Sequence, residues 1–315
     1  MSYYPSHLTR FHGLPVYAFP TAGNDRPTAL PAPASVAWKL SAGECSFEEL
    51  WRRLLDEVPT EEVTALVVGM WWEGWDEHGS DSVIDLLTAQ ADRFPRLRAV
   101  FLGDVESEES EISWIKQGHV TRLLRAWPDL VELGVRGAEG LVIEPLRHDG
   151  LRMLRIESGG LPREPVRALG ACEFPALQHL ELWLGTTWYG GDCSADDIEP
   201  LLTASGRLPA LRHLGLQNSD IQDDIAAAVA AAPIVAGIES LDLSMGALSD
   251  EGGCALLSGQ PLTHLRTLNL RHHFMSGQLT RRLSEALEPH DVSLDLTPAR
   301  RHSWNPETRY VAVGE

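Results

Sequence analysis

Histidine and carboxylate residues recur at matched positions of this sequence, and they are groups that bind divalent metal ions. His179 directly precedes Leu180, and His213 occupies the same place before Leu214, 34 residues later. Glu181 and Asp242 directly follow the middle leucines of similar segments. Two imidazoles and a carboxylate can hold a cation that activates water, which makes a metal-dependent hydrolase one hypothesis. The alternative is a polar surface for protein contact. Because the spacing follows a repeat rather than a ligand motif, we expect no resident metal and no catalytic residue.

Tryptophans and acids gather in three other stretches of the chain. These are Met70–His78 with Trp71, Trp72 and Trp75, then residues 104–114 with Glu108, Glu109 and Trp114, and finally residues 185–197 with Trp188 and Tyr189. Aromatic faces beside carboxylates suit a cationic partner, through cation–π attraction and charge pairing. These stretches predict a surface for a basic protein or peptide, or a polyamine. The alternative is that the tryptophans pack beneath their own loops and the acids are solvated.

Composition and missing motifs exclude several functions. The chain has 26 basic and 45 acidic residues in 315, a net charge of −19, which argues against binding a nucleic-acid backbone. No apolar run approaches the ~18–20 residues of a membrane helix, and the start lacks a signal-peptide pattern. Four scattered cysteines without a C-x-x-C pair favour a reducing compartment, so we expect a cytoplasmic protein. The common nucleotide-binding and hydrolase motifs are absent, which predicts no cofactor.

A short apolar pattern returns eight times and predicts the elements that position these residues. An apolar residue, two variable ones, an apolar, one variable and an apolar recur, with steps of 34, 33, 21, 26, 34, 27 and 27 residues between the middle apolar positions. The pattern appears as Val63-Leu66-Val68, Leu97-Val100-Leu102, Leu130-Leu133-Val135, Leu151-Leu154-Ile156, Leu177-Leu180-Leu182, Leu211-Leu214-Leu216, Ile238-Leu241-Leu243 and Leu265-Leu268-Leu270. Leucine-rich repeats usually run ~20–29 residues, each with one strand and a helix or looser turn. The pattern therefore predicts an α/β leucine-rich-repeat solenoid, with a curved parallel sheet on the concave side and helices and turns on the convex side.

The segments between the strands carry helix signals. Ser46 and Glu49 have capping-box spacing before Phe47–Leu55, and Ser82 with Asp85 indicates a similar start. Residues 223–232 and 276–287 also have helical periodicity, whereas residues 137–148 are too short a connection for a helix. We therefore expect helices on the convex side of most repeats.

The predicted organisation has four parts. Residues 1–34 are rich in proline and are expected to cover the first repeat, and residues 35–62 form a cap strand and helix. Residues 63–297 form the repeat array with a C-terminal cap, and residues 298–315 are expected to be a flexible tail. Tyr310, Val311 and Val313 in that tail can add as a strand to an exposed edge, although a disordered end without a role is the alternative.

Three segments of the repeat array resemble a known type of repeat. Residues 211–221, 238–257 and 265–287, with Leu-Asp-Leu-Ser at 241–244, resemble ribonuclease-inhibitor-type leucine-rich repeats. The whole chain, from His7 to Pro15 and on to the tail, is similar to an uncharacterised bacterial leucine-rich-repeat family. The resemblance implies an accessory or substrate role beside radical-SAM-type enzymes encoded nearby, with Tyr310 as a target of modification. The ninth repeat position departs from the family, because it lacks the usual asparagine or cysteine.

Stacking the repeats predicts which side chains share the concave face. Fourth and sixth positions point inward, so third, fifth and seventh positions point out, and His179 lies about 4.8 Å from His213 on the neighbouring strand. We predict a non-enzymatic scaffold that binds a protein or peptide, with metal-dependent hydrolysis around His179 and His213 as the alternative. The predicted partner-binding residues are Trp71, Trp72, Trp75, Glu108, Glu109, Trp114, Glu132, Arg155, His179, Glu181, Trp183, Trp188, Tyr189, His213 and Asp242.

Overall fold

The computed structural model describes residues 5–21, 29–43, 45–72, 78–300 and 308–314. Within them, one twelve-stranded sheet has its strands in chain order, from β1 at one edge to β12 at the other. Eleven strands run parallel, and only β1 pairs antiparallel, with β2. The strands are β1 (Arg10–Phe11), β2 (Leu14–Ala18), β3 (Ala37–Leu40), β4 (Ala65–Val68), β5 (Ala99–Leu102), β6 (Glu132–Arg136), β7 (Met153–Glu157), β8 (His179–Gly185), β9 (His213–Ser219), β10 (Ser240–Asp242), β11 (Thr267–Asn269) and β12 (Ser293–Asp295).

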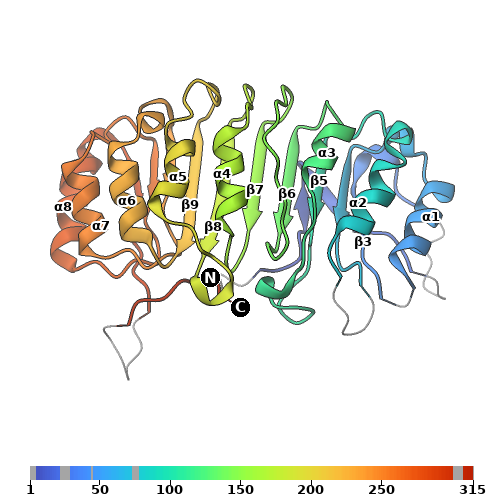
Figure 1. The fold of residues 1–315 in the computed structure, drawn as a ribbon, viewed down its shortest axis with the longest axis horizontal. Helices are drawn as coiled ribbons and strands as arrows, with labels where there is room; N and C mark the ends of the chain where they lie inside the picture. Colours follow the sequence, from blue (N-terminus) through green and yellow to red (C-terminus); the bar gives the residue numbers. More distant parts are fainter. Residues whose placement is uncertain (1–4, 22–28, 44, 73–77, 301–307, 315) are drawn as a thin grey trace.

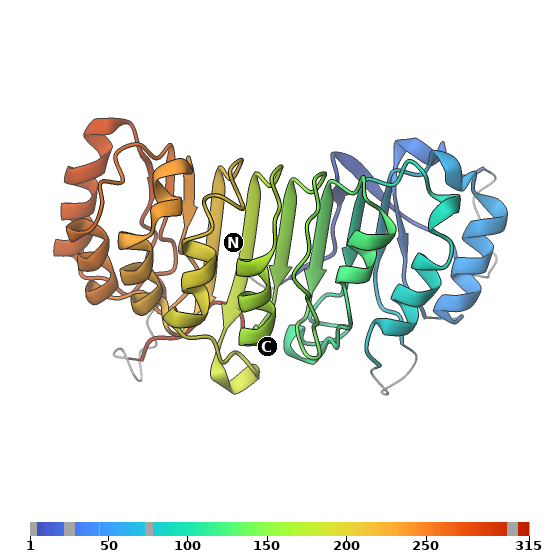
Figure 2. The same cartoon turned by 45° about the horizontal axis from the view of Figure 1, so that its top comes forward.

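Helices lie along one face of this sheet, in the same order as the strands (Figures 1 and 2). They are α1 (Phe47–Glu57), α2 (Asp81–Thr88), α3 (Thr121–Ala126), α4 (Arg163–Ala171), α5 (Ala195–Leu202), α6 (Gln222–Ala231), α7 (Asp250–Ser258) and α8 (Gly277–Leu287). Short 3-10 turns are η1 (Pro33–Ser35), η2 (Thr60–Glu62), η3 (Ala91–Arg93), η4 (Ile112–Trp114), η5 (Thr187–Tyr189), η6 (Pro233–Gly237) and η7 (Glu288–His290). The opposite face, which we call the open face, has no helix layer.

Capping serines explain the starts of four helices, α1, α5, α7 and α8. The Ser46 hydroxyl accepts a hydrogen bond from the Glu49 amide at the start of α1, and Ser276 caps α8 in the same way. Between β6 and β7 the chain crosses without a helix, as the short step predicts. The predicted start at Ser82 is wrong, because α2 already begins at Asp81 and Ser82 lies inside it.

The core lies between the sheet and the helices. The fourth and sixth residues of the pattern are buried throughout, and Leu241 and Leu243 have no exposed surface. Leu241 pairs with Leu214 on one side and with Leu268 on the other, so the leucines form continuous rows across the strands. The predicted register is confirmed, and it places the alternate side chains on the open face.

The N-terminal residues do more than cover one unit. His12 and Gly13, with φ of 50° and 74°, form the two-residue turn between β1 and β2, and β2 extends the sheet beside β3. Phe11 then lies on the open face, buried against Ala37, Ala65, Val67, Ala99 and Phe101 of β3, β4 and β5. The segment expected to cover the first repeat therefore adds strands to the sheet and covers three units.

Candidate functional site

The open face is covered near its N-terminal end by residues 5–13, which we call the N-terminal segment. The rings of Phe11 and Phe101 meet edge to face at 5.9 Å between centroids. Gly134 makes room for this contact, since a Cβ there would lie 2.2 Å from Cδ2 of Phe101. Small residues at 37, 65 and 99 complete the space for Phe11. This part of the face is filled by the chain itself and is closed to a partner.

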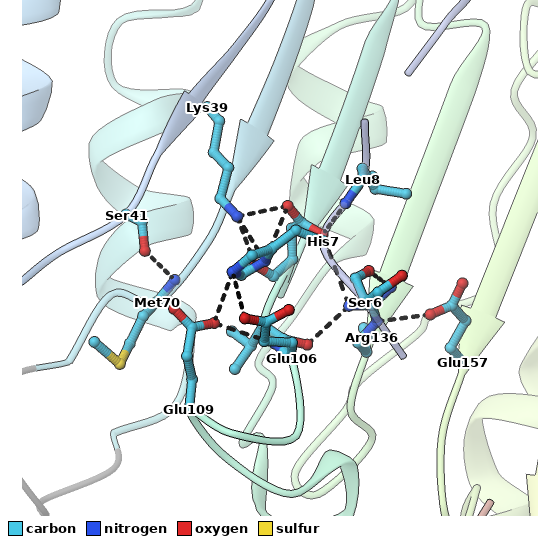
Figure 3. A network of polar contacts seen from close by, with 12 residues as sticks. Ser6, His7, Leu8, Lys39, Ser41, Met70, Glu106, Glu109, Arg136 and Glu157 are labelled. Carbon is cyan, nitrogen blue, oxygen red and sulfur yellow. Dashed lines mark hydrogen bonds and ion pairs between the residues drawn. The ribbon is translucent and has the colours of Figure 1, made fainter. Parts of the chain in front are cut away.

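A buried ionic network holds the same segment in place (Figure 3). Asp104 has no exposed surface, its Oδ1 accepts a hydrogen bond from the Leu8 amide at 2.9 Å, and its Oδ2 lies 2.7 Å from Lys39 Nζ. Arg136 pairs with buried Glu157 at 2.7 Å and donates to the carbonyl oxygens of Val105 and Ser6. These groups were not recognised as a site from the sequence, because nothing in the spacing of residues 39, 104 and 136 indicates their contact.

Part of the acidic stretch after β5 contacts the N-terminal segment beside this network. His7 Nε2 lies 3.4 Å from a Glu109 oxygen and 3.6 Å from a Glu106 oxygen. Glu109 also accepts a hydrogen bond from the Glu106 amide at 3.1 Å. Glu109 thus contacts the N-terminal segment, and both Glu108 and Glu109 remain exposed.

The tryptophans predicted as a partner surface divide into buried and exposed ones. Trp71 and Trp72 are 7% and 4% exposed, their rings meet edge to face at 5.0 Å, and Trp71 Nε1 donates to the His78 carbonyl. Both side chains belong to the main apolar core, which favours the alternative that these tryptophans pack within the chain. Trp75 lies outside the described residues. Trp114 and Trp188 are 56% and 90% exposed.

These two exposed tryptophans lie beyond the carboxyl ends of the strands. Trp114 belongs to η4 after β5, and Trp188 belongs to η5 after β8. The two turns lie at the lower edge of the sheet in Figure 1, on either side of the C-terminus. Tyr189 is half-buried beside Gly314. This edge, with Glu108, Trp114 and Trp188, is called the lower rim below.

The middle of the open face carries an uncovered polar cluster. In one row across the strands Glu132, Met153, His179, His213 and Ser240 are neighbours, and in the next row Arg155, Glu181, Gly215 and Asp242 are neighbours. The predicted rows are thus present. The His179 and His213 rings stack at 4.0 Å with 7° between their planes. Two pockets of about 250 and 360 Å³ meet at Arg155, between the N-terminal segment and β6–β8. We call this region, from Glu132 to Asp242, the groove.

Glu181 is the strongest anion of the groove. Burial favours its neutral form, but hydrogen bonds from His179 and Trp183 and the charge of Arg155 outweigh that effect and lower the pKa of Glu181 to about 2. Trp183 Nε1 donates to Glu181 at 2.9 Å, and Arg155 Nε lies 3.2 Å from the same oxygen. Trp183 itself is 6% exposed, so it supports Glu181 rather than presenting its ring as predicted.

The remaining titratable groups of the groove differ from Glu181. Burial and the adjacent His179 ring lower the pKa of His213 to about 4, so His213 is neutral at pH 7. Burial raises the pKa of Asp242, although hydrogen bonds from Ser244, Gln217 and Asn269 oppose the rise. Glu132 pairs with His12 at 2.9 Å. The groove is therefore anionic around Glu181, with Arg155 as its one neighbouring cation in this row of the described residues.

The histidine–glutamate cluster meets one requirement of a metal site and fails another. Among the described residues, His179, Glu181 and His213 place their ligand atoms within 4.8 Å of one another. An imidazole nitrogen binds a metal in the plane of its ring, at about 2.0–2.1 Å for zinc. Since the two stacked rings are nearly parallel and 4.0 Å apart, one ion cannot lie in both planes. Metal binding would require both rings to rotate and Glu181 to give up its hydrogen bond from His179.

Comparisons with known proteins leave the activity open. No protein-family model and no curated protein matches the chain. The fold is similar to a crystal structure of a protein from Bacteroides fragilis, a structural-genomics target, with a TM-score of 0.79 and 26% identity over 89% of this chain and 78% of that one. The description of that structure names no activity. The likeness supports the α/β architecture with its largely parallel sheet.

The length and apolar character of the helices bear on membrane insertion. Among the described residues, no helix combines the length and apolar character needed to cross a bilayer.

Proposed function

We propose that this chain is a leucine-rich-repeat solenoid that binds a basic protein or peptide and catalyses no reaction. The solenoid interpretation rests on the strand order, which follows the chain, and on the leucine rows that continue through successive units. A unit of this kind cannot bury its apolar face alone, and stacking produces one continuous core. What remains outside the core is a row of polar side chains on the open face.

The observation that carries the binding proposal is the ionised Glu181 at the centre of an uncovered groove. Its side chain is 13% exposed, and its pKa of about 2 keeps the carboxylate charged at pH 7. A lysine or arginine of a partner can share this carboxylate with Arg155. The two pockets next to Arg155 have room for side chains of an extended peptide.

The lower rim extends the same surface. Glu108 is exposed there, and Trp114 and Trp188 offer aromatic faces that attract guanidinium or ammonium groups. The net charge of −19 adds long-range attraction for a basic partner. We therefore propose the groove as the centre of the interface and the lower rim as its margin.

Affinity purification from the native host tests this proposal, with Glu181→Gln compared with the unaltered chain. The amide still accepts hydrogen bonds but lacks the charge, so we expect recovery of a basic partner to fall about tenfold, or about 1.4 kcal/mol. Calorimetry with the purified partner should show weaker binding at higher salt.

Glu285→Gln in α8 is the matched control, since Glu285 is exposed on the helix side. Equal recovery by all three proteins would show that the groove is not the interface.

A further inference from the structure

The C-terminal segment, residues 308–314, crosses the carboxyl ends of β8 to β11 and has a bend at Ala312. Val313 has no exposed surface and lies among Ile112, Trp183 and Met245. Val313 therefore does not belong to a flexible tail, contrary to the prediction for residues 298–315. In Figure 1 the C-terminus lies at the lower edge, near the middle of the sheet.

Three residues in left-handed conformation hold this segment. Asn218, Met245 and His272 have φ of 56°, 69° and 66° and follow one another at intervals of 27 residues. Each lies four positions after the middle leucine of its repeat. Residues other than glycine rarely adopt this conformation, which also occurs at Gly137, the matching position after β6.

Each of the three contacts a different part of the segment. The Asn218 side chain both donates to the Val313 carbonyl at 2.6 Å and accepts from the Val313 amide at 2.9 Å. The Met245 carbonyl accepts from the Ala312 amide at 2.7 Å. The His272 ring meets the Tyr310 ring edge to face, and its Nε2 lies 3.1 Å from the Tyr310 carbonyl oxygen. Together these contacts involve both main chain and side chains of residues 310–313.

The segment passes three neighbouring repeats in turn. The row from His272 to Asn218 spans two strand spacings, about 10 Å, and residues 310–313 cross it with a bend at Ala312. Further along, Gly159 allows the chain to pass, since a Cβ there would lie 2.2 Å from the Gly314 carbonyl oxygen. The segment thus crosses the strands with one repeat for each contact.

We propose that Asn218, Met245 and His272 form a peptide-recognition site, which selects a segment with an aromatic residue three positions before a valine. The C-terminal segment is its built-in ligand, and a peptide with the same pattern can replace it. The Asn218 side chain hydrogen-bonds to the main chain of the valine. The pocket of Ile112, Trp183 and Met245 holds the valine side chain. His272 and Phe274 contact the aromatic ring. This site is distinct from the groove, although Trp183 borders both.

A full-length Val313→Asp chain provides an empty site, because a carboxylate is disfavoured in the apolar valine pocket. We expect a labelled peptide of residues 308–315 to bind this variant saturably, measured by fluorescence polarisation. The same peptide with Val313→Asp should bind at least tenfold more weakly.

Two site variants in the Val313→Asp chain separate recognition from folding. Asn218→Gly keeps the left-handed backbone, which glycine adopts freely, but removes the side chain that clamps Val313. Gly159→Ala blocks the passage of Gly314. Each should weaken peptide binding at least tenfold, whereas Glu285→Gln should leave it unchanged.

Hydrogen exchange on the unaltered chain tests whether a peptide replaces the C-terminal segment, even if the Val313→Asp chain fails to fold. A tethered segment competes at an effective concentration of about 1 mM, so peptide above that level should increase exchange at residues 309–314 severalfold. A folded Val313→Asp chain that does not bind the peptide would overturn the proposal. Unchanged exchange in the unaltered chain at saturating peptide would do the same.

Discussion

The two ends of the chain both dock on the sheet, but by different physical means. The N-terminal segment inserts Phe11 into an apolar cluster and closes a buried network of Asp104, Lys39 and Arg136. The C-terminal segment buries one side chain completely, Val313, and is also held by hydrogen bonds with Asn218 and Met245, by the Arg309–Asp223 ion pair and by the contact of the Tyr310 ring with His272. Opening of the first attachment leaves a space lined by apolar residues of three strands where Phe11 lay, whereas departure of the second uncovers the smaller pocket of Val313. We infer that the N-terminal segment is a fixed part of the fold and the C-terminal segment is exchangeable.

Asp104→Ala should produce the largest effect on this contrast. It leaves Lys39 and Arg136 short of their buried anion, and breaking a buried ion pair costs about 3–5 kcal/mol. Urea unfolding followed by circular dichroism measures the loss. The control Glu108→Ala, in the same stretch but exposed, should stay within about 0.5 kcal/mol of the unaltered chain. Similar values for both variants would contradict the structural role of Asp104.

Val313→Ala should have a smaller effect on global stability, about 1–2 kcal/mol, because it removes two methyl groups from one pocket. Its local effect should be larger. In native-state hydrogen exchange we expect the amides of residues 312 and 313 to open independently of the sheet, while the Leu8 amide exchanges only with global unfolding. Equal opening energies for the two segments would remove the distinction drawn between them.

The groove should respond to pH in a defined direction. His213 has a pKa of about 4 in the folded chain, below its ordinary value of 6.5, so the unfolded chain binds this proton first. Stability from His213 is therefore complete above pH 6.5 and declines as the pH falls to 4. Glu181, with a pKa of about 2, loses its contribution only below about pH 4.5. In His213→Gln the urea unfolding midpoint should change less between pH 6.5 and 4.5 than in the unaltered chain. The same change of midpoint with pH in both proteins would count against a buried neutral imidazole at position 213.

Metal content should be the smallest effect. Because the stacked rings of His179 and His213 cannot share an ion in their common arrangement, protein purified without a histidine tag should carry far less than one zinc per chain. Elemental analysis after dialysis against zinc measures this. One ion per chain, lost in His179→Ala, would instead favour the hydrolase hypothesis.

The repeat pattern predicted the fold closely at positions where the same type of residue takes the same place in every repeat. Leucines at the fourth and sixth positions are buried, so the strands and the rows of the groove follow directly from their spacing. The neighbours Glu132, Arg155, Glu181 and Asp242 were therefore predictable. The roles of Trp71 and Trp72 were not, because a tryptophan in a loop packs inward or outward according to the space beneath it.

The sequence by itself determined which side chains point into the core and which share a row, because alternation along a strand and stacking of similar units leave one consistent register. Only the tertiary structure decided where the two ends of the chain dock. Phe11 needs the space left by Ala37, Ala65 and Gly134, and Val313 needs a pocket assembled from three separate loops and strands. Such complementarity depends on the shape of the folded surface, and no periodicity in the sequence encodes it.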